Sequence, residues 1–125
     1  MILLVNPRVT KARNRRFPLS VMSVGAALPV GVSWEILDGN LPHLDVLQAV
    51  SERVERGRAA GDPVTAIALT VMPGPQLVSA IHLTRGLRQA FPGVAIVWGG
   101  YFPTLYPEPV LRSDDVDYVV RGQGE

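Results

Sequence analysis

The chain contains no cysteine, which removes several kinds of chemistry from consideration. Disulfides, thiolate metal sites, ligation of iron–sulfur clusters and cysteine nucleophiles all require that side chain. Histidine is nearly as scarce, with His43 and His82 the two in 125 residues. Both fall in segments that we expect to be helical, away from the loops at strand ends. We therefore interpret them as surface or packing residues rather than ligands.

An excess of either charge and any long apolar run are also lacking. The 12 Lys/Arg and 11 Asp/Glu residues give a net charge of +1, which provides no overall attraction to nucleic acid or anionic lipid. No apolar run approaches the roughly 20 residues that span a bilayer. The start, MILLVNPR, lacks the basic region and cleavage site of a signal peptide. We expect a cytoplasmic protein with no nucleic-acid or membrane partner.

The remaining composition is that of a folded globular chain. Apolar residues make up 47% of the sequence and charged residues 18%. A chain of this length fits one domain, because domains commonly have roughly 100–150 residues. We therefore expect a single domain over residues 1–125.

Short, β-branched apolar runs alternate with segments of helical periodicity, and Gly/Pro turns separate them. The expected strands are 2–6, 32–37, 64–71, 94–98 and 116–120, and the expected helices are 19–28, 43–57, 77–91 and 103–111. The second helix has an inner stripe of Leu47, Val50 and Val54, with Gly57 near its end. This alternation predicts an α/β fold whose parallel sheet is covered on both faces. No helix is expected after the last strand, so we interpret the chain as a fragment of a longer protein.

In an open parallel sheet, ligands bind beyond the carboxyl ends of the strands. The stretch VWGGYFPTLYPE, at 97–108, places Gly99 and Gly100 where the fourth strand reaches this edge. A residue without Cβ lets a ligand approach the backbone closely or lets the chain adopt positive φ. Tyr101, Phe102 and Pro103 would then wall the site. The alternative is a turn whose aromatic residues cap the core, but the position favours a ligand.

The loop after the first strand holds a cluster of basic residues. Arg8, Lys11, Arg13, Arg15 and Arg16 lie within it. The cluster suits a phosphate, a carboxylate or an acidic neighbouring domain, or it is a solvated loop. Arg8, nearest the strand end, is the best candidate for contact with a ligand. A stand-alone anion-binding protein remains a third possibility, and its affinity would fall steeply with salt.

Several other sites are absent from the strand-end loops. Neither GxGxxG nor GxxxxGK[ST] follows the first strand, so neither of these two phosphate cradles is present. Asn6 and Thr70 stand where a receiver domain needs acidic residues. The run Asp114, Asp115 and Asp117 is expected to be solvated, and no serine has a histidine in an evident relay. We expect no catalytic residue and no metal ligand in this chain.

Six segments, taken in order, carry a family resemblance. They are ILLVNP, FPLSVMSVGAAL, WEILDGN, TVMPGPQ, VWGGYFPTLYPE and DYVVRGQGE. Together they resemble the N-terminal cobalamin (B12)-binding domain of cobalamin-dependent radical S-adenosylmethionine enzymes. The resemblance covers essentially the whole chain, and the pair formed by the last two segments is its most specific part.

The resemblance implies a flavodoxin-like (Rossmann-like), doubly wound sheet of strand order 2-1-3-4-5, with cobalamin at its carboxyl edge. Gly99 and Gly100 match the glycines that line the nucleotide tail, which enters between the first and fourth strand loops. Met72 and Gln76 are expected near the corrin ring. The full set of cofactor-binding residues that we predict is Asn6, Pro7, Arg8, Pro18, Leu19, Thr70, Val71, Met72, Gln76, Gly99, Gly100, Tyr101, Phe102, Pro103 and Gly122.

Many cobalamin-binding domains carry DxHxxG after the first strand, and its histidine is the lower ligand of cobalt. Here the corresponding stretch is NPRVTK, from Asn6 to Lys11, without histidine. The resemblance therefore implies cobalamin in a base-off form without a protein histidine ligand, which suits a methyl carrier. Gln123 stands where the family has an acidic residue, so no carboxylate role is carried over to it.

In the family, cobalt takes a methyl group from S-adenosylmethionine and delivers it to a substrate carbon. The [4Fe–4S] cluster of such enzymes needs CxxxCxxC, so the cluster and the S-adenosylmethionine site are expected in a barrel that follows Glu125. The function predicted for this chain is to hold cobalamin within a radical S-adenosylmethionine methyltransferase (EC 2.1.1). The alternative is a docking domain of the same fold that has lost cobalamin.

Overall fold

The computed structural model describes residues 1–9 and 16–125, and its centre is a five-stranded parallel sheet. The strands are β1 (Ile2–Asn6), β2 (Trp34–Asp38), β3 (Ala66–Thr70), β4 (Ala95–Gly99) and β5 (Tyr118–Val119). Their order in the sheet is β2-β1-β3-β4-β5, and all neighbours are parallel. The doubly wound, flavodoxin-like fold predicted from the sequence is therefore confirmed, including its strand order.

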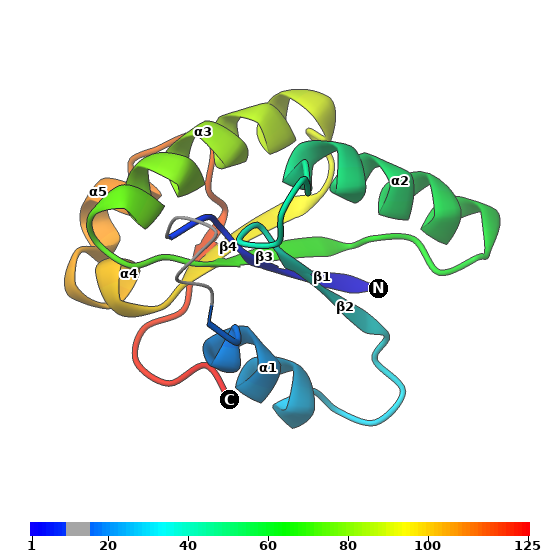
Figure 1. Ribbon diagram of the computed structural model, residues 1–125, viewed down its shortest axis with the longest axis horizontal. Helices are drawn as coiled ribbons and strands as arrows, with labels where there is room; N and C mark the ends of the chain where they lie inside the picture. The colour runs from blue at the N-terminus through cyan, green and yellow to red at the C-terminus, as the bar shows by residue number, and fades with distance from the viewer. Residues whose placement is uncertain (10–15) are drawn as a thin grey trace.

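The helices lie on both faces of the sheet, as Figure 1 shows. They are α1 (Leu19–Ala27), α2 (Val46–Ala59), α3 (Pro75–Ala90), α4 (Tyr101–Leu105) and α5 (Pro107–Leu111). Helices α2 and α3 cover one face, and α1 lies on the other. Among the described residues, no helix has the length and apolar character that crossing a membrane would require.

The single helix expected over 103–111 is instead two short ones. Tyr106 ends α4 with φ −127° and ψ 62°, and Pro107 then begins α5. Proline has no N–H to donate and fixes its own φ, so it is readily placed in the first turn of a new helix but not within an existing one. The break turns the chain at the carboxyl edge of β4, where α4 begins directly after Gly100.

The start of α2 also differs from the expectation that His43 begins this helix. His43 lies in the preceding turn with φ 63°, and the helix begins at Val46. Asp45 is the N-cap, and its Oδ1 accepts a hydrogen bond from the N–H of Gln48 at 3.1 Å. An aspartate in this position satisfies a donor that the first helical turn leaves free.

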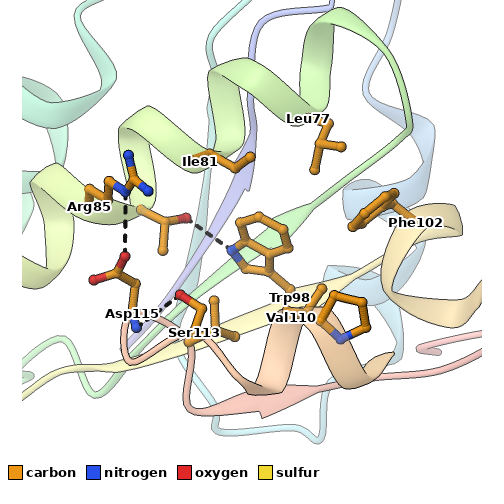
Figure 2. Close-up of a pocket in the computed structure, with 11 residues that line it drawn as sticks. Leu77, Ile81, Arg85, Trp98, Phe102, Val110, Ser113 and Asp115 are labelled. Carbon is orange, nitrogen blue, oxygen red and sulfur yellow. Dashed lines mark hydrogen bonds and ion pairs between the residues drawn. The ribbon is translucent and has the colours of Figure 1, made fainter. Parts of the chain in front are cut away.

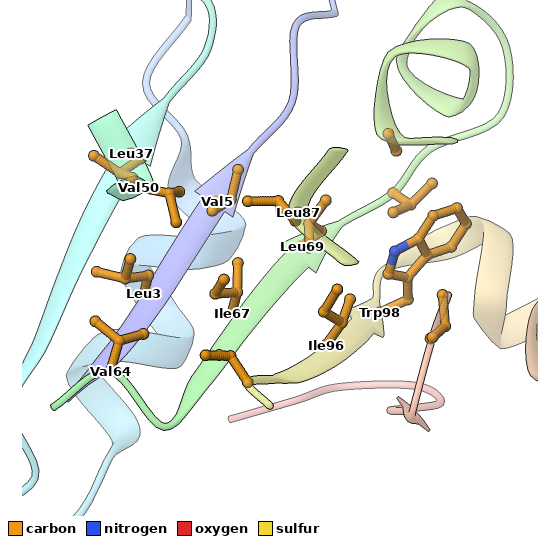
Figure 3. Close-up of a cluster of buried hydrophobic side chains, with 14 of the residues drawn as sticks. Leu3, Val5, Leu37, Val50, Val64, Ile67, Leu69, Leu87, Ile96 and Trp98 are labelled. Carbon is orange, nitrogen blue, oxygen red and sulfur yellow. The ribbon is translucent and has the colours of Figure 1, made fainter. Parts of the chain in front are cut away.

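The hydrophobic core fills the space between the sheet and helices α2 and α3 (Figure 3). Its strand residues are Leu3, Val5, Leu37, Ile67, Leu69, Val71, Ile96 and Trp98, all buried. In α2 the expected inner positions Val50 and Val54 are buried, but Leu47 is 36% exposed, so its inclusion in the stripe was wrong. Gly57 lies inside α2, where a Cβ would come within 2.5 Å of the carbonyl oxygen of Asp62.

The opposite face of the sheet carries smaller side chains and is covered less completely. Ala66, Ala68 and Ala95 lie on it and are partly exposed, together with Val97 and Gly99. Helix α1 lies over β1 and β2, and a Cβ on Gly25 would lie 2.6 Å from the Trp34 ring. The part of this face formed by β3 and β4 is consequently left with an open groove.

Asp117 anchors the strand-five region instead of belonging to a solvated run, which corrects the expectation for this residue. Its Oδ2 accepts hydrogen bonds from the N–H of Ile96 at 2.7 Å and from Arg88 at 2.6 Å. Desolvation acts to raise the pKa of Asp117, but these bonds and the charge of Arg88 outweigh it, so the pKa lies below the ordinary 3.8. A lowered pKa means that this stabilisation is present above the unfolded value and is lost as the pH falls through the folded value.

Replacing Asp117 by asparagine should therefore destabilise the fold at neutral pH. It should also make the free energy of unfolding depend less on pH in the acid range. We expect a loss of about 1 kcal/mol, since the carboxylate is partly exposed and its ion pair is screened. Urea unfolding at pH 7 and below pH 4 measures both effects. Asp114→Asn, at an exposed neighbouring position, is the matched control. Equal losses for Asp117→Asn at both pH values would contradict the assigned role of its charge.

Candidate functional site

The open groove beside α1, here called the α1 groove, has a volume of about 270 Å³. Its floor comes from β1, β3 and β4, one wall comes from α1, and the other comes from residues 120–125, which follow β5. The lining residues include Leu4, Ser20, Val21, Ser23, Val24, Ala68, Thr70, Val97, Gly99, Gly100, Val120 and Gly122. Small side chains on the floor leave the groove open, and its surface is mainly apolar.

A second hollow lies at the carboxyl edge of the sheet and is here called the edge pocket. Its volume is about 480 Å³. The residues that line it are Asn6, Val9, Arg16, Phe17, Pro18, Leu19, Ser20, Asn40, Thr70, Met72, Gln76, Gly100 and Tyr101. Ser20, Thr70 and Gly100 line both hollows, so the α1 groove opens into the edge pocket at the ends of β3 and β4.

The two glycines at the end of β4 lie in different surroundings, and different features of the structure explain them. A Cβ on Gly99 would meet no atom closer than 3.8 Å, where Val120 lies, so the absence of a side chain here leaves the groove empty. Gly100 has φ +97°, and a Cβ on it would lie 3.0 Å from both Thr70 Oγ1 and the backbone nitrogen of Val71. The backbone therefore requires Gly100, whereas among the described residues no contact at the Cβ position requires Gly99.

A buried side chain, Gln76, ties together the loops under the edge pocket. It is 1% exposed. Its Nε2 donates to Asn6 Oδ1 and to the carbonyl oxygen of Pro7, each at 3.0 Å, and its Oε1 accepts from the N–H of Met72 at 2.8 Å. Two of these hydrogen bonds reach the end of β1 and the third reaches the loop after β3, so Gln76 holds these two loops at a fixed separation.

The same network continues to β2 through Asp38. Its Oδ1 accepts from Asn6 Nδ2 at 2.9 Å and from the N–H and Nδ2 of Asn40 at 3.0 and 2.9 Å. Asn40 Oδ1 in turn accepts from the N–H of Val9 at 2.8 Å. A connected polar layer beneath the edge pocket, here called the amide network, consists of Gln76, Asn6, Asp38, Asn40 and Val9. Such a network fixes the loops before any ligand arrives.

Most of the predicted site residues line one of the two hollows. They are Asn6, Pro18, Leu19, Thr70, Met72, Gln76, Gly99, Gly100, Tyr101 and Gly122. Leu19 is 67% exposed and Tyr101 56% exposed, so both form the rim of the edge pocket. Residues that are far apart in the sequence thus meet at one edge of the sheet, as expected for the carboxyl ends of parallel strands.

The other predicted residues lie elsewhere. Pro7 and Arg8 line a separate hollow near the start of α2, where Arg8 Nε donates to the carbonyl oxygen of Gly39 at 3.4 Å. Val71 is buried on the core face of the sheet, and Pro103 is buried in α4. Lys11, Arg13 and Arg15 of the basic cluster lie outside the described residues.

Phe102 lies on the α3 side of the sheet, in a third hollow of about 250 Å³ (Figure 2). There it lies near Leu77 and Trp98, and the Trp98 Nε1 donates to Thr84 Oγ1 at 3.0 Å. Arg85 and Asp115 form an ion pair of 3.8 Å at the rim of this hollow. Phe102 and Tyr101 are adjacent in sequence but line different hollows, Phe102 the one beside α3 and Tyr101 the edge pocket.

Sequence reasoning did not identify the groove residues Ser20, Ser23, Ala68 and Val97. The signal was present, because side chains two apart on a strand share a face. Ala68 lies two residues before Thr70, and Val97 lies two residues before Gly99. Alternation backward from the predicted residues would have located both. Ser20 and Ser23 are three apart on α1 and so share one face of that helix.

Neither histidine lines the α1 groove or the edge pocket. His43 is exposed in the turn before α2, and His82 is exposed in the middle of α3. Within residues 1–9 and 16–125, no group of three or more acidic or histidine side chains is placed to hold a metal ion. The described residues thus offer an apolar cleft with amide groups at its base rather than a metal centre.

The family model described as "B12 binding domain" matches residues 5–125. The chain belongs to the B12-binding domain family. The resemblance inferred from the sequence motifs is thereby confirmed, and the matched range includes every element of the sheet except the first residues of β1. In this B12-binding domain, the edge pocket lies at the carboxyl ends of the strands, where open parallel sheets bind their ligands, and the α1 groove opens into it.

The chain is also similar to part of a longer enzyme. The chain is 32% identical over 110 residues to an anaerobic magnesium-protoporphyrin IX monomethyl ester cyclase from Synechocystis sp.. The similarity covers 86% of the B12-binding domain and 21% of the cyclase, so the chain spans about a fifth of that relative's length. No solved structure matches the chain significantly.

Proposed function

We propose that the chain holds cobalamin with its nucleotide tail in the α1 groove and its corrin ring over the edge pocket. The observation that carries the proposal is Gly99, where the space for a side chain is free and opens into the groove. A narrow apolar groove that leads into a wider pocket suits a ligand with an extended tail and a broad ring. The rim residues Leu19, Met72 and Tyr101 are 67%, 47% and 56% exposed and supply apolar surface for the ring.

The domain's own residues bind and orient the cofactor. Thr70 and Ser20 lie at the junction of the two hollows, and Ser20 Oγ donates to Thr70 Oγ1 at 3.4 Å. Both hydroxyls are placed to reach polar groups of the tail where it leaves the ring. The amide network holds the loops below the ring in a fixed arrangement, and the apolar rim excludes water from the lower face of the ring.

We further propose that cobalamin is bound base-off and without a histidine ligand. Neither His43 nor His82 lines a hollow in the described part of the chain. When bound, cobalamin supplies a cobalt centre that accepts and releases a methyl group. A weakly ligated lower face suits this role, and the amide groups of Asn6 and Gln76 are already engaged with each other and with the backbone.

The protein that contains this domain is proposed to be a cobalamin-dependent radical S-adenosylmethionine enzyme, with a methyltransferase as the first candidate. Its [4Fe–4S] cluster and S-adenosylmethionine site would lie in another part of that protein, because the present sequence has no cysteine. The similarity to a cyclase favours a ring-forming enzyme as the second candidate. A docking domain without cobalamin is the alternative to both.

Retention of cobalamin tests the binding proposal directly. The purified chain is mixed with hydroxocobalamin, dialysed exhaustively and examined by visible spectroscopy. We expect stoichiometric retention and the spectrum of the base-off form. A colourless protein after dialysis would favour the docking alternative, and a base-on spectrum would refute the placement of the tail in the α1 groove.

The double substitution His43→Ala/His82→Ala tests the absence of a histidine ligand. Because both side chains are exposed and lie outside the two hollows, the spectrum of the bound cobalamin is expected to remain that of the wild type. The measurement is the visible spectrum between pH 5 and 8, the range in which imidazole titrates (about 6.5). A changed spectrum would show that one of the two histidines ligates cobalt, and the two single substitutions would identify which.

A further inference from the structure

A single hydroxyl connects the two sequence motifs that follow β4 and β5. Thr104, in α4, donates from Oγ1 to the carbonyl oxygen of Gly100 at 2.7 Å. The Oγ1 of Thr104 also accepts a hydrogen bond from the backbone N–H of Gly122 at 2.9 Å. The carbonyl oxygen of Thr104 also accepts from Arg121 Nε at 3.4 Å. Thr104 thus joins the turn after β4 to the segment after β5.

The segment that Thr104 holds is one wall of the α1 groove. Val120 and residues 122–125 line the groove opposite α1. The wall approaches the helix closely, because a Cβ on Gly124 would lie 3.4 Å from Val24 Cγ2. The width of the groove therefore depends on where this segment lies.

Few other contacts fix this segment. The N–H of Val120 donates to the carbonyl oxygen of Trp98 at 2.9 Å and ends the pairing with β4. Within the described chain, the hydrogen bonds made by residues 121–125 are those from Arg121 and Gly122 to Thr104. All five of these residues are exposed. Loss of the Thr104 hydroxyl would consequently remove the hydrogen bond of Gly122 and leave the wall held by Val120 and by the 3.4 Å bond from Arg121.

We propose that Thr104 is a positioning residue that sets the width of the α1 groove and so controls binding of the nucleotide tail. The inference rests on the proposed function, since it takes the tail to be the occupant of the groove. Thr104 lines neither the groove nor the edge pocket, so it acts through Gly100 and Gly122 rather than by touching the ligand. The hydrogen bonds of Thr104 then link the PT segment at 103–104 physically to the RGxG segment at 121–124.

The glycine at position 122 supports this reading. Gly122 has φ +77°, a conformation that allows the chain to turn its N–H toward Thr104 and that other residues rarely adopt. Its Cβ position meets nothing within 4 Å, so the conformation and not crowding requires glycine. A left-handed residue and a hydroxyl therefore act together to hold the wall.

Two ligands separate an effect on the tail from a general effect on the site. Cobalamin carries the nucleotide tail, and cobinamide is the same corrin without it. We would measure dissociation constants of both for the wild type, Thr104→Val, Thr104→Ser and Thr65→Val. Valine keeps the shape of threonine but removes the hydroxyl, and serine keeps the hydroxyl. Thr65→Val is the matched control, because Thr65 is exposed and bonds the carbonyl oxygen of Met1 at the other end of the sheet.

Thr104→Val is expected to weaken cobalamin binding roughly tenfold, the upper end of what the loss of one hydrogen bond produces. Its affinity for cobinamide should change by less than about twofold, and Thr104→Ser and Thr65→Val should resemble the wild type for both ligands. Amide hydrogen exchange provides a second measurement that does not depend on ligand. The Gly122 amide should be protected in the wild type and in Thr104→Ser but should exchange rapidly in Thr104→Val.

The outcomes that overturn the proposal are distinct from those that overturn the proposed function. Equal weakening of both ligands by Thr104→Val would show a general structural role, and unchanged binding of both would show no role in the groove. Either result refutes the positioning role while cobalamin binding stands. If the wild type binds neither ligand, the proposed function fails and the positioning role falls with it.

Discussion

Replacement of Gly99 by leucine is expected to abolish retention of cobalamin while the domain remains folded. The new side chain would point into the α1 groove, where the nearest atom to its Cβ is 3.8 Å away. It would therefore fill the space that we assign to the nucleotide tail, and its Cβ would clash with no described atom. We expect affinity for cobalamin to fall roughly a hundredfold or more, since close-packed sites tolerate extra volume poorly.

The stability of Gly99→Leu should lie within about 1 kcal/mol of the wild type, because glycine in a strand is itself unfavourable. Urea unfolding and a binding titration with cobalamin measure the two quantities separately. Gly93→Leu is the matched control, since Gly93 has no atom within 4 Å of its Cβ position and lies in the turn before β4. Unchanged uptake of cobalamin by Gly99→Leu would show that the tail lies elsewhere.

Gly100 does not offer an equally clear experiment, although it is the neighbouring residue of the pair. Its φ of +97° and the 3.0 Å approach of its Cβ position to Thr70 and Val71 mean that any side chain strains the backbone. Loss of binding in a Gly100 variant would therefore mix an effect on the fold with an effect on the site. Gly99 is therefore the one of the two glycines whose substitution tests the site.

Replacement of Gln76 by leucine is expected to produce the largest loss of stability among single substitutions at the site. Leucine is similar in size but leaves the N–H of Met72, Asn6 Oδ1 and the carbonyl oxygen of Pro7 without the hydrogen bonds that Gln76 makes. Because Gln76 is 1% exposed, water does not replace these bonds easily. We expect a decrease of about 3 kcal/mol in the free energy of unfolding, measured by urea denaturation.

Binding should fall together with stability in Gln76→Leu, because the loops after β1 and β3 would no longer be held at a fixed separation. Gln48→Leu serves as the matched control, since Gln48 is exposed on α2 and its side chain bonds only Glu52 within the described residues. A decrease of less than about 1 kcal/mol for Gln76→Leu would mean that the amide network is easily replaced by other contacts.

The sequence was sufficient to predict the fold because its signals are local and mutually consistent. The apolar strands are short and are bounded by glycine and proline, and α3 carries its buried residues at helical spacing. The prediction differed from the structure where a single residue determined a helix boundary. Pro107 divides the last helical region into α4 and α5, and Asp45, not His43, caps α2.

The location of the site was also predictable, but the orientation of its side chains was not. Sequence reasoning placed Tyr101 and Phe102 together, whereas Tyr101 lines the edge pocket and Phe102 lines the hollow beside α3. Gln76 was expected near the corrin ring, and it does line the edge pocket, yet its polar atoms are engaged in the amide network. A one-dimensional pattern does not contain such long-range hydrogen bonds.

The unequal faces of the sheet separate two tasks that most small domains must combine. Bulky residues such as Leu3, Ile67 and Trp98 stabilise the fold on the side of α2 and α3, whereas Ala68, Val97 and Gly99 shape the cleft on the other. Adjacent positions of one strand therefore serve different tasks. Substitutions on the cleft side can change which ligand fits, while the buried side chains that stabilise the fold stay in place.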